Sequence, residues 1–266
     1  MANNTQIKEI IEECIPLIRK LAIGRYAISI GGSVGKGKSD QSSDIDFRLF
    51  CEKVLPDSEE KKEVLESFHT IIAKWKSRAV EIDGCWIRTV AEIEQQLSDW
   101  DTGEGSPIDK IWAVWGYYLL TDITNQYIIE DPFDMIRQWQ KQLSQYPEKL
   151  KKAVLDKHIE SVKYWRNDYH YINKIKREDV VFLSSLSVKL VHDLIQIIFA
   201  INNTYYVGDG YNLDYIKEFK QQPPLFIKRV KSALYPSYSE DMYIKQRDTL
   251  VSLIDDVLKL VQLQKS

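Results

Sequence analysis

A glycine-rich loop between two strand-like segments constrains the fold of this chain more than any other feature of its sequence. The loop, GSVGKGKS, spans residues 32–39 and follows the short, β-branched segment YAISIG. A polar turn then leads into DIDFRLF, residues 44–50, in which apolar and polar side chains alternate. Because such alternation is typical of a half-buried strand, the sequence predicts two strands, at 26–31 and 44–51, that run antiparallel and are joined by the loop.

The same octapeptide matches the phosphate-binding pattern G-x-x-x-x-G-K-[ST], with Gly37, Lys38 and Ser39 at its end. In a P-loop these residues lie between a strand and the first turn of a helix, whose amide groups bind phosphate. Here a polar cluster and a second strand follow Ser39, so the sequence predicts no such helix. A P-loop phosphotransferase is therefore the less favoured alternative.

The composition is that of a soluble globular protein. Of the 266 residues 44% are hydrophobic and 28% are charged, which predicts a folded core. Three scattered cysteines without a C-x-x-C pair favour free thiols in a reducing cytoplasm. The N-terminus lacks a signal-peptide pattern and no apolar run reaches the ~18 residues that span a membrane, so a cytoplasmic location without a membrane partner is expected. The net charge of −3 argues against nucleic acid as the main partner.

Hydrophobic periodicity predicts an α/β region followed by a helical one. The first region is expected to contain helices at 5–22, 56–75 and 91–99, a strand or hairpin at 79–90, a tryptophan-rich helix at 108–120 and a strand at 126–131. Beyond residue 132 alternation is almost absent, and proline and glycine separate helical segments. We therefore predict an α+β chain, with a small mixed-sheet domain over 1–132 and a helical bundle domain over 133–266.

Asp44 and Asp46 give the strongest chemical signal in the sequence. On a strand, positions i and i+2 share a face, with Cα atoms about 6.6 Å apart. Two adjacent carboxylates repel each other unless a cation lies between them. Mg²⁺ is the expected cation, because it prefers oxygen ligands and commonly binds together with nucleotide phosphates. A solvent-facing strand that carries two aspartates is the alternative.

The glycine loop and the aspartate pair together resemble a known superfamily. Gly32-Ser33, ten further residues and DIDF are similar to the signature of the polymerase β-like nucleotidyltransferases, and among these most of all to the aminoglycoside and lincosamide nucleotidyltransferases. The segments IIEDPFDMI, YPEKL and FAINNTYYVGDGYN are similar to uncharacterised nucleotidyltransferases of this kind. The resemblance implies a nucleotidyltransferase domain followed by a helical bundle domain.

The resemblance also implies a set of catalytic carboxylates. Asp44 and Asp46 would bind Mg²⁺, and a third carboxylate on a neighbouring strand would complete the metal site or accept a proton. Glu81 is the best match, because VEI repeats the hydrophobic-acid-hydrophobic pattern of the signature. Asp83 is the runner-up, and would belong to a turn if Asp83-Gly84 closed a hairpin.

Five residues are assigned by the resemblance to the nucleoside triphosphate. Gly32, Ser33, Lys38 and Ser43 come from the loop, and Lys189 comes from the helical region, where it would contact phosphate from a cleft between the domains. For Lys38 the alternative is a solvated loop charge, and for Lys189 it is a charge on the exposed stripe of an amphipathic helix.

The implied activity is transfer of a nucleoside monophosphate from an NTP, with ATP expected, to a hydroxyl of a small-molecule acceptor. An antibiotic is one candidate acceptor, which would make the protein an antibiotic-resistance enzyme. Two alternatives stay open: a nucleotidyltransferase that modifies a protein or RNA, and a degenerate nucleotide-binding module.

Overall fold

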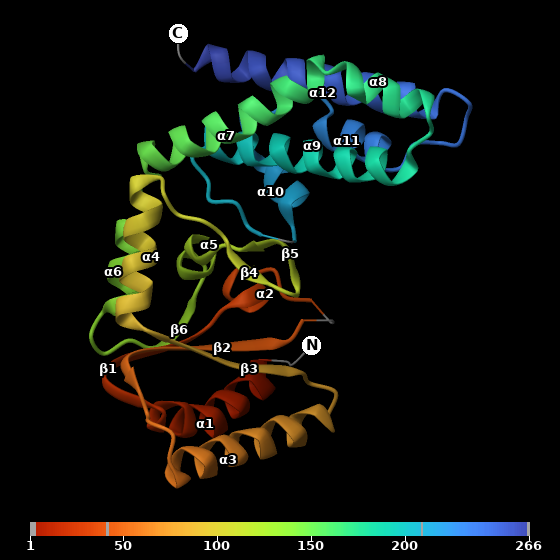
Figure 1. Cartoon of the computed structure of the whole chain (residues 1–266). Helices are drawn as coiled ribbons and strands as arrows, with labels where there is room; N and C mark the ends of the chain where they lie inside the picture. The colour runs from red at the N-terminus through yellow and green to blue at the C-terminus, as the bar shows by residue number, and fades with distance from the viewer. Residues whose placement is uncertain (1–3, 41–42, 209, 265–266) are drawn as a thin grey trace. The chain divides into compact units, whose positions relative to one another are not determined.

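The computed structural model describes residues 4–40, 43–208 and 210–264. The chain forms two compact units, one made of Met1–Asp99 with Leu119–Gln145 and the other of Trp100–Tyr118 with Tyr146–Ser266. The first unit contains a mixed β-sheet with helices, and the second is mainly helical (Figure 1). The predicted α+β fold with a helical C-terminal region is confirmed.

The first unit is built on a four-stranded sheet in the order β3-β2-β1-β6. Its strands are β1 (Ala22–Ile30), β2 (Ile45–Val54), β3 (Ile82–Thr89) and β6 (Tyr127–Glu130). The glycine loop connects β1 to β2, which run antiparallel, as the sequence predicts. β6 is also antiparallel to β1, whereas β3 is parallel to β2.

One face of the sheet packs against two helices. α1 (Asn4–Lys20) and α3 (Glu59–Lys76) lie side by side on this face (Figure 1) and correspond to the predicted helices at 5–22 and 56–75. Alternate residues of β2 are buried in the core that these helices share with the sheet, and the ring of Phe47 lies edge-on to Phe68, with 6.3 Å between centroids. Because successive side chains of a strand point to opposite faces of the sheet, the intervening residues of β2 lie on the other face.

The other face of β2 carries the polar side chains. It contacts α6 (Met135–Gln142) through an edge-on pair between Phe50 and Trp139, whose ring centroids lie 5.4 Å apart. The same face also contacts α5 (Leu119–Thr124), through a buried ion pair between Arg48 and Asp122. Asp46 thus belongs to the face opposite α1 and α3, and Asp44 directly precedes the strand.

Residues 79–90 contain one continuous strand, so the hairpin alternative is wrong. β3 pairs with β2 along its length, and the register shifts by one residue between Ile45 and Asp46. Gly84 has φ +126°, a conformation that side chains rarely adopt, and it lies where this irregularity occurs. Asp83 and Gly84 therefore form a bulge within a strand. Glycine favours a bulge for the same reason that it favours a turn, because it can adopt a positive φ.

The predicted helix at 108–120 is also wrong. This segment forms a two-stranded antiparallel sheet of β4 (Ile108–Lys110) and β5 (Ala113–Tyr117) in the second unit, and α5 begins only at Leu119. Gly116 has φ +82°, which is incompatible with a helix interior. The aromatic and β-branched residues of the segment are those that favour strands.

The second unit is organised around one apolar helix. Its helices are α7 (Glu148–Asn167), α8 (Tyr169–Lys176), α9 (Val180–Ile201), α10 (Asn212–Glu218), α11 (Phe226–Leu234) and α12 (Met242–Leu263). α9 contacts all the others of this set. Within the described ranges it is the one helix long and apolar enough to cross a membrane, but 67% of the relevant stretch is buried inside the structure, as in the core helix of a soluble protein.

Helix α4 (Val90–Thr102) follows β3 directly and corresponds to the predicted helix at 91–99. Glu92 closes its first turn, because its carboxylate accepts hydrogen bonds from the amide and the hydroxyl of Thr89. This arrangement ends β3 and starts the helix at adjacent residues.

Candidate functional site

The glycine loop begins with one helical turn and then continues as irregular chain. Strand β1 leads through Gly31 into α2 (Gly32–Gly35), and the Gly31 amide donates to the carbonyl oxygen of Asp46 at 2.9 Å. The Lys38 amide donates to the Ser33 carbonyl oxygen, also at 2.9 Å, which folds the loop back. In the described residues that follow α2 and precede β2 there is no helix, so the structure does not provide the helix that a P-loop needs at Lys38.

Gly32 allows a carboxylate to lie against the backbone of the loop. Its φ is +58°, and a Cβ atom at this position would overlap Oδ2 of Asp46. The neighbouring Ser33 has a buried hydroxyl oxygen with no hydrogen-bond partner in the described structure. Leaving a buried polar atom unpaired costs about 1–3 kcal/mol, so this hydroxyl marks a position where a polar ligand would be stabilised.

The Asp46 carboxylate is held in a poorly hydrated position. Its side chain is 17% exposed, and burial raises its pKa to about 6. The positive charge of Arg48 opposes this rise, whereas the negative charges of Asp44, Asp83 and Asp122 increase it. A cation bound beside Asp46 would favour the ionised form, because it offsets both the burial and the repulsion.

A buried ion pair lies beside the aspartates and is not apparent in the sequence. Arg48 donates from Nε and Nη2 to the two carboxylate oxygens of Asp122, at 3.1 and 3.3 Å, and both side chains are 5% exposed. Nη1 of Arg48 lies 3.9 Å from Oδ1 of Asp46, and the guanidinium stacks over Trp86. The i, i+2 spacing from Asp46 indicates the face on which Arg48 lies, but no sequence signal points to Asp122 as its partner.

Of the two lysines in the loop, the structure brings Lys36 to the carboxylates. Burial lowers the pKa of Lys36, and the nearby charges of Asp122 and Asp46 oppose that change. The side chain of Lys38, the residue predicted to bind phosphate, is exposed. Lys36 is therefore a second cationic group of this site.

The two candidates for a third carboxylate lie in different surroundings. Glu81 precedes β3, its carboxylate is 59% exposed, and it forms an ion pair with Lys76 at 3.2 Å. Its carbonyl oxygen accepts from the Ile45 amide. Asp83 lies at the bulge of β3, where its charge contributes to the raised pKa of Asp46. The structure therefore brings Asp83 near Asp46 and pairs Glu81 with a surface lysine.

Two other predicted nucleotide ligands have local partners. The hydroxyl of Ser43 accepts from the Asp40 amide at 2.8 Å, within a turn of the loop. Lys189 belongs to the second unit, where its ammonium group lies 2.7 Å from a carboxylate oxygen of Asp193 and 2.5 Å from the hydroxyl of Ser161. The carboxylate of Asp193 therefore compensates the charge of Lys189.

The carboxylates near the glycine loop suit a cation that binds together with phosphate groups. In the part of the chain that the structure describes, no group of three or more His, Cys, Asp or Glu side chains is close enough to hold a metal ion. Mg²⁺ is commonly bound by one or two carboxylates and completed by substrate phosphates and water. Asp44 and Asp46 provide such a pair, and the unpartnered Ser33 hydroxyl and the close approach at Gly32 fit a phosphate beside them.

Comparison with known proteins gives a family match for part of the chain. Residues 112–209 match a family described as a domain of unknown function (DUF4037). The matched range includes Asp122 and Lys189 but begins after the glycine loop and the aspartates, and it covers less than half of the 266-residue chain. No curated protein shows significant similarity to the chain.

Proposed function

We propose that this chain is a Mg²⁺-dependent nucleotidyltransferase that moves a nucleoside monophosphate from an NTP, with ATP expected, to a hydroxyl of a small acceptor in the cytoplasm. The observation that carries the proposal is the position of the Asp46 carboxylate against Gly32, beside the unpartnered hydroxyl of Ser33. A carboxylate, a glycine that permits close approach and a buried donor together suit a metal-bound triphosphate.

Each polar group near the loop has a role in this proposal. Asp44 and Asp46 would bind Mg²⁺, which when bound neutralises phosphate charge and polarises the α-phosphorus. The Gly32 amide and the Ser33 hydroxyl would donate to the β- and γ-phosphates. Lys36 would add positive charge at the same phosphates, and Lys38, Ser43 and Lys189 stay predicted phosphate ligands.

The transfer itself needs a proton acceptor near the aspartates. The acceptor hydroxyl would attack the α-phosphorus in line, so that an oxygen–phosphorus bond forms while the bond to the β-phosphate oxygen breaks and pyrophosphate leaves. Asp83 or Glu81 would take the hydroxyl proton, and the proximity of Asp83 to Asp46 favours Asp83.

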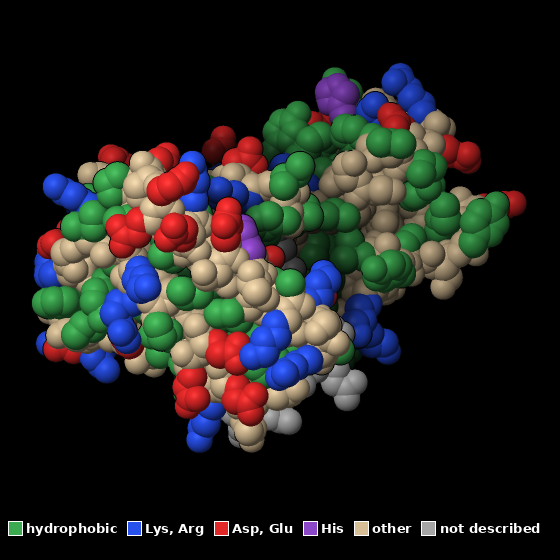
Figure 2. Space-filling view, turned by 90° about the horizontal axis from the view of Figure 1, so that it is seen from below, with side chains coloured by type: hydrophobic (Ala, Val, Ile, Leu, Met, Phe, Trp, Pro, Cys, Tyr) green, Lys and Arg blue, Asp and Glu red, His purple; other side chains and the backbone are tan. Residues whose placement is uncertain are grey.

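The acceptor is assigned to the helical region because the acidic residues must stay open to the metal and the nucleotide. Residues 1–132 would supply the chemistry and residues 133–266 the selectivity, with an antibiotic as one candidate acceptor. A folded RNA would instead require an extended basic surface. Figure 2 shows both acidic and basic side chains on one face of the molecule, and the net charge of −3 favours a small acceptor or a protein over RNA.

A degenerate nucleotide-binding module is the second candidate. It is supported by the finding that no three acidic, His or Cys side chains in the described residues form a metal-binding group. Such a module would bind Mg²⁺-NTP through the same loop and would release no pyrophosphate.

The experiment that tests the proposal combines binding and turnover. Purified protein is first screened for thermal stabilisation by each NTP with Mg²⁺, and then for label transfer from the α-phosphate to a panel of aminoglycosides and lincosamides. Replacing Asp44 or Asp46 with Asn should abolish transfer and NTP stabilisation, while the melting temperature without ligand holds or rises because one repelling charge is gone.

Two matched variants separate the remaining assignments. Asp83→Asn should reduce transfer much more than Glu81→Gln, because only Asp83 is close to the reacting centre. NTP stabilisation without transfer to any acceptor would favour the degenerate module, and full activity of Asp44→Asn or Asp46→Asn would exclude the metal assignment.

A further inference from the structure

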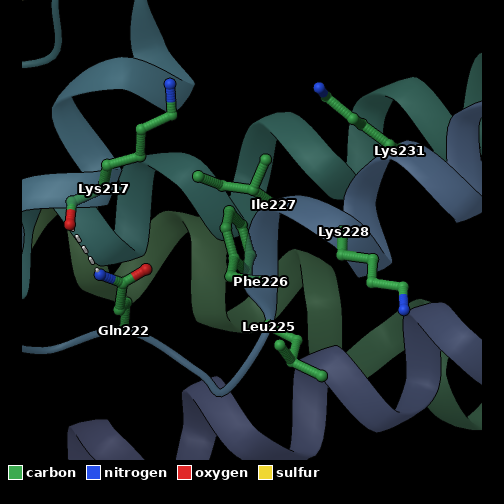
Figure 3. A pocket seen from close by; sticks show the side chains of 7 residues that line it. All are labelled: Lys217, Gln222, Leu225, Phe226, Ile227, Lys228 and Lys231. Atoms are coloured by element: carbon green, nitrogen blue, oxygen red, sulfur yellow. Dashed lines mark hydrogen bonds between the residues drawn. The ribbon is translucent and has the colours of Figure 1, made fainter.

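A hollow with an apolar floor lies between the end of α10 and the start of α11, in the second unit. Its volume is about 530 Å³, and Figure 3 shows the side chains that line it. Phe226 is 1% exposed and Ile227 is partly buried, so these two residues belong to the floor. Leu225 stands at the rim with 70% of its surface exposed. This volume accommodates one or two large side chains of a ligand.

Three lysines surround this floor, and no acidic residue lines it. In Figure 3 the ammonium groups of Lys217 and Lys231 point to the same side, past Ile227, and Lys228 points to the opposite side. Lys217 is paired with Asp214 at 2.5 Å. Lys228 and Lys231 form no ion pair or side-chain hydrogen bond with any residue that the structure describes. The rim therefore carries uncompensated positive charge on two sides of an apolar hollow.

Leu225 has a backbone conformation that its side chain disfavours. It occupies the N-cap position of α11 with φ +55° and ψ +28°, and its side chain offers no cap to the first turn. Asn, Asp or Ser would suit this position better, because each can cap the helix, and Asn and Asp also tolerate the left-handed region. Leu225 thus combines an apolar side chain exposed to solvent with an unfavourable backbone conformation, and such locally unfavourable features concentrate at functional sites.

We propose that this hollow docks an acidic peptide segment of a partner protein, in which a large apolar side chain enters the hollow beside Leu225 and flanking carboxylates pair with Lys228 and Lys231. Charge complementarity selects an acidic ligand, and the apolar floor selects a hydrophobic anchor within it. The hollow around Phe226 is open to solvent, so a side chain of the peptide can enter it and pack beside the exposed Leu225.

The proposal is independent of the nucleotidyltransferase assignment, since none of its residues belongs to the site described above. The full-length protein is used to select binders from a displayed library of random peptides, and the selected peptides are titrated by fluorescence anisotropy. We expect enrichment of peptides with one or two large apolar residues flanked by Asp or Glu, with affinity that falls as salt increases.

A charge-reversal pair and its matched control locate the binding site. The double variant Lys228→Glu with Lys231→Glu should weaken binding by about tenfold or more, because attraction becomes repulsion at both sides of the hollow. The control, Lys149→Glu with Lys259→Glu, makes the same change of net charge at exposed lysines of the same unit and should leave affinity within about twofold. Equal weakening by both pairs would show non-specific charge attraction and would overturn the proposal.

Replacing Leu225 separates docking from folding. Leu225→Asn should keep or raise the melting temperature, because Asn tolerates the left-handed conformation, and it should weaken peptide binding by about tenfold. Retained affinity in Leu225→Asn, selected peptides without acidic and apolar residues, or binding to vesicles of anionic lipid in place of peptide would each overturn the proposal.

Discussion

The contact between Gly32 and Asp46 makes one prediction that the structure allows to be worked out in detail. Gly32→Ala places a Cβ atom at φ +58°, where it overlaps the Asp46 carboxylate. The left-handed conformation costs a non-glycine residue about 1–2 kcal/mol. Moving the carboxylate off its preferred rotamer costs about 0.5–1.5 kcal/mol more. We therefore expect the free energy of unfolding to fall by about 1.5–3.5 kcal/mol.

Gly37→Ala is the matched control for this variant. Gly37 lies in the same loop with φ +62°, and a Cβ atom there would have nothing within 4 Å. It should therefore lose only the conformational component, about 1–2 kcal/mol. Both substitutions reduce the entropy of the unfolded chain equally, so the difference between the two variants isolates the contact with Asp46.

The assay is urea denaturation of both variants, without ligand and with Mg²⁺-NTP. At a ligand concentration 100 times the dissociation constant, binding adds about 2.7 kcal/mol to the stability of the folded state. Gly37→Ala should retain most of this stabilisation, whereas Gly32→Ala should lose it, because its Cβ displaces the carboxylate. Equal destabilisation of the two variants, with nucleotide stabilisation kept in both, would refute the assignment of Gly32 and Asp46 to one site.

Three further predictions concern stability and affinity. Burial lowers the pKa of His192 to about 4, below its ordinary value of 6.5. As the pH falls from 6.5 to 4, this histidine is therefore protonated in the unfolded state before it is protonated in the folded state, and the free energy of unfolding decreases. This loss should reach about 3 kcal/mol in urea titrations at the two pH values and be absent in His192→Gln. Asp122→Asn removes the carboxylate that accepts two hydrogen bonds from the buried Arg48, and the remaining carboxylate of Asp46 lies farther away, at 3.9 Å. The free energy of unfolding should fall by about 3–5 kcal/mol in urea denaturation, and an effect below about 1 kcal/mol would show that Asp46 compensates the arginine. Lys36→Ala should weaken Mg²⁺-NTP binding in isothermal titration more than Lys38→Ala does, and the reverse order would restore Lys38 as the main phosphate ligand.

The parts of the fold that could be predicted from the sequence are those that show a short hydrophobic period, of about two residues in strands and about 3.6 residues in helices. Alternation at 44–50 predicts β2, and the strand observed begins at Ile45, so that it contains Asp46 and directly follows Asp44. The polar cluster after the glycines likewise predicts a loop between antiparallel strands, and β1 and β2 have that arrangement. The nearly unbroken helical pattern beyond residue 132 predicts α6 of the first unit and the helices from α7 to α12 of the second unit.

The tertiary structure alone decided which of these residues meet. Asp122 pairs with Arg48 from 74 positions away in the sequence, and Asp83 rather than Glu81 comes close to Asp46 because a bulge shifts the register of β3. Hydrophobic periodicity predicts which residues are buried, but it does not predict which side chains contact each other. These contacts depend on strand pairing and on the packing of elements that are distant in the sequence. For the same reason the sequence located the aspartate pair, and only the fold revealed the buried Arg48 and the half-buried Lys36 beside it.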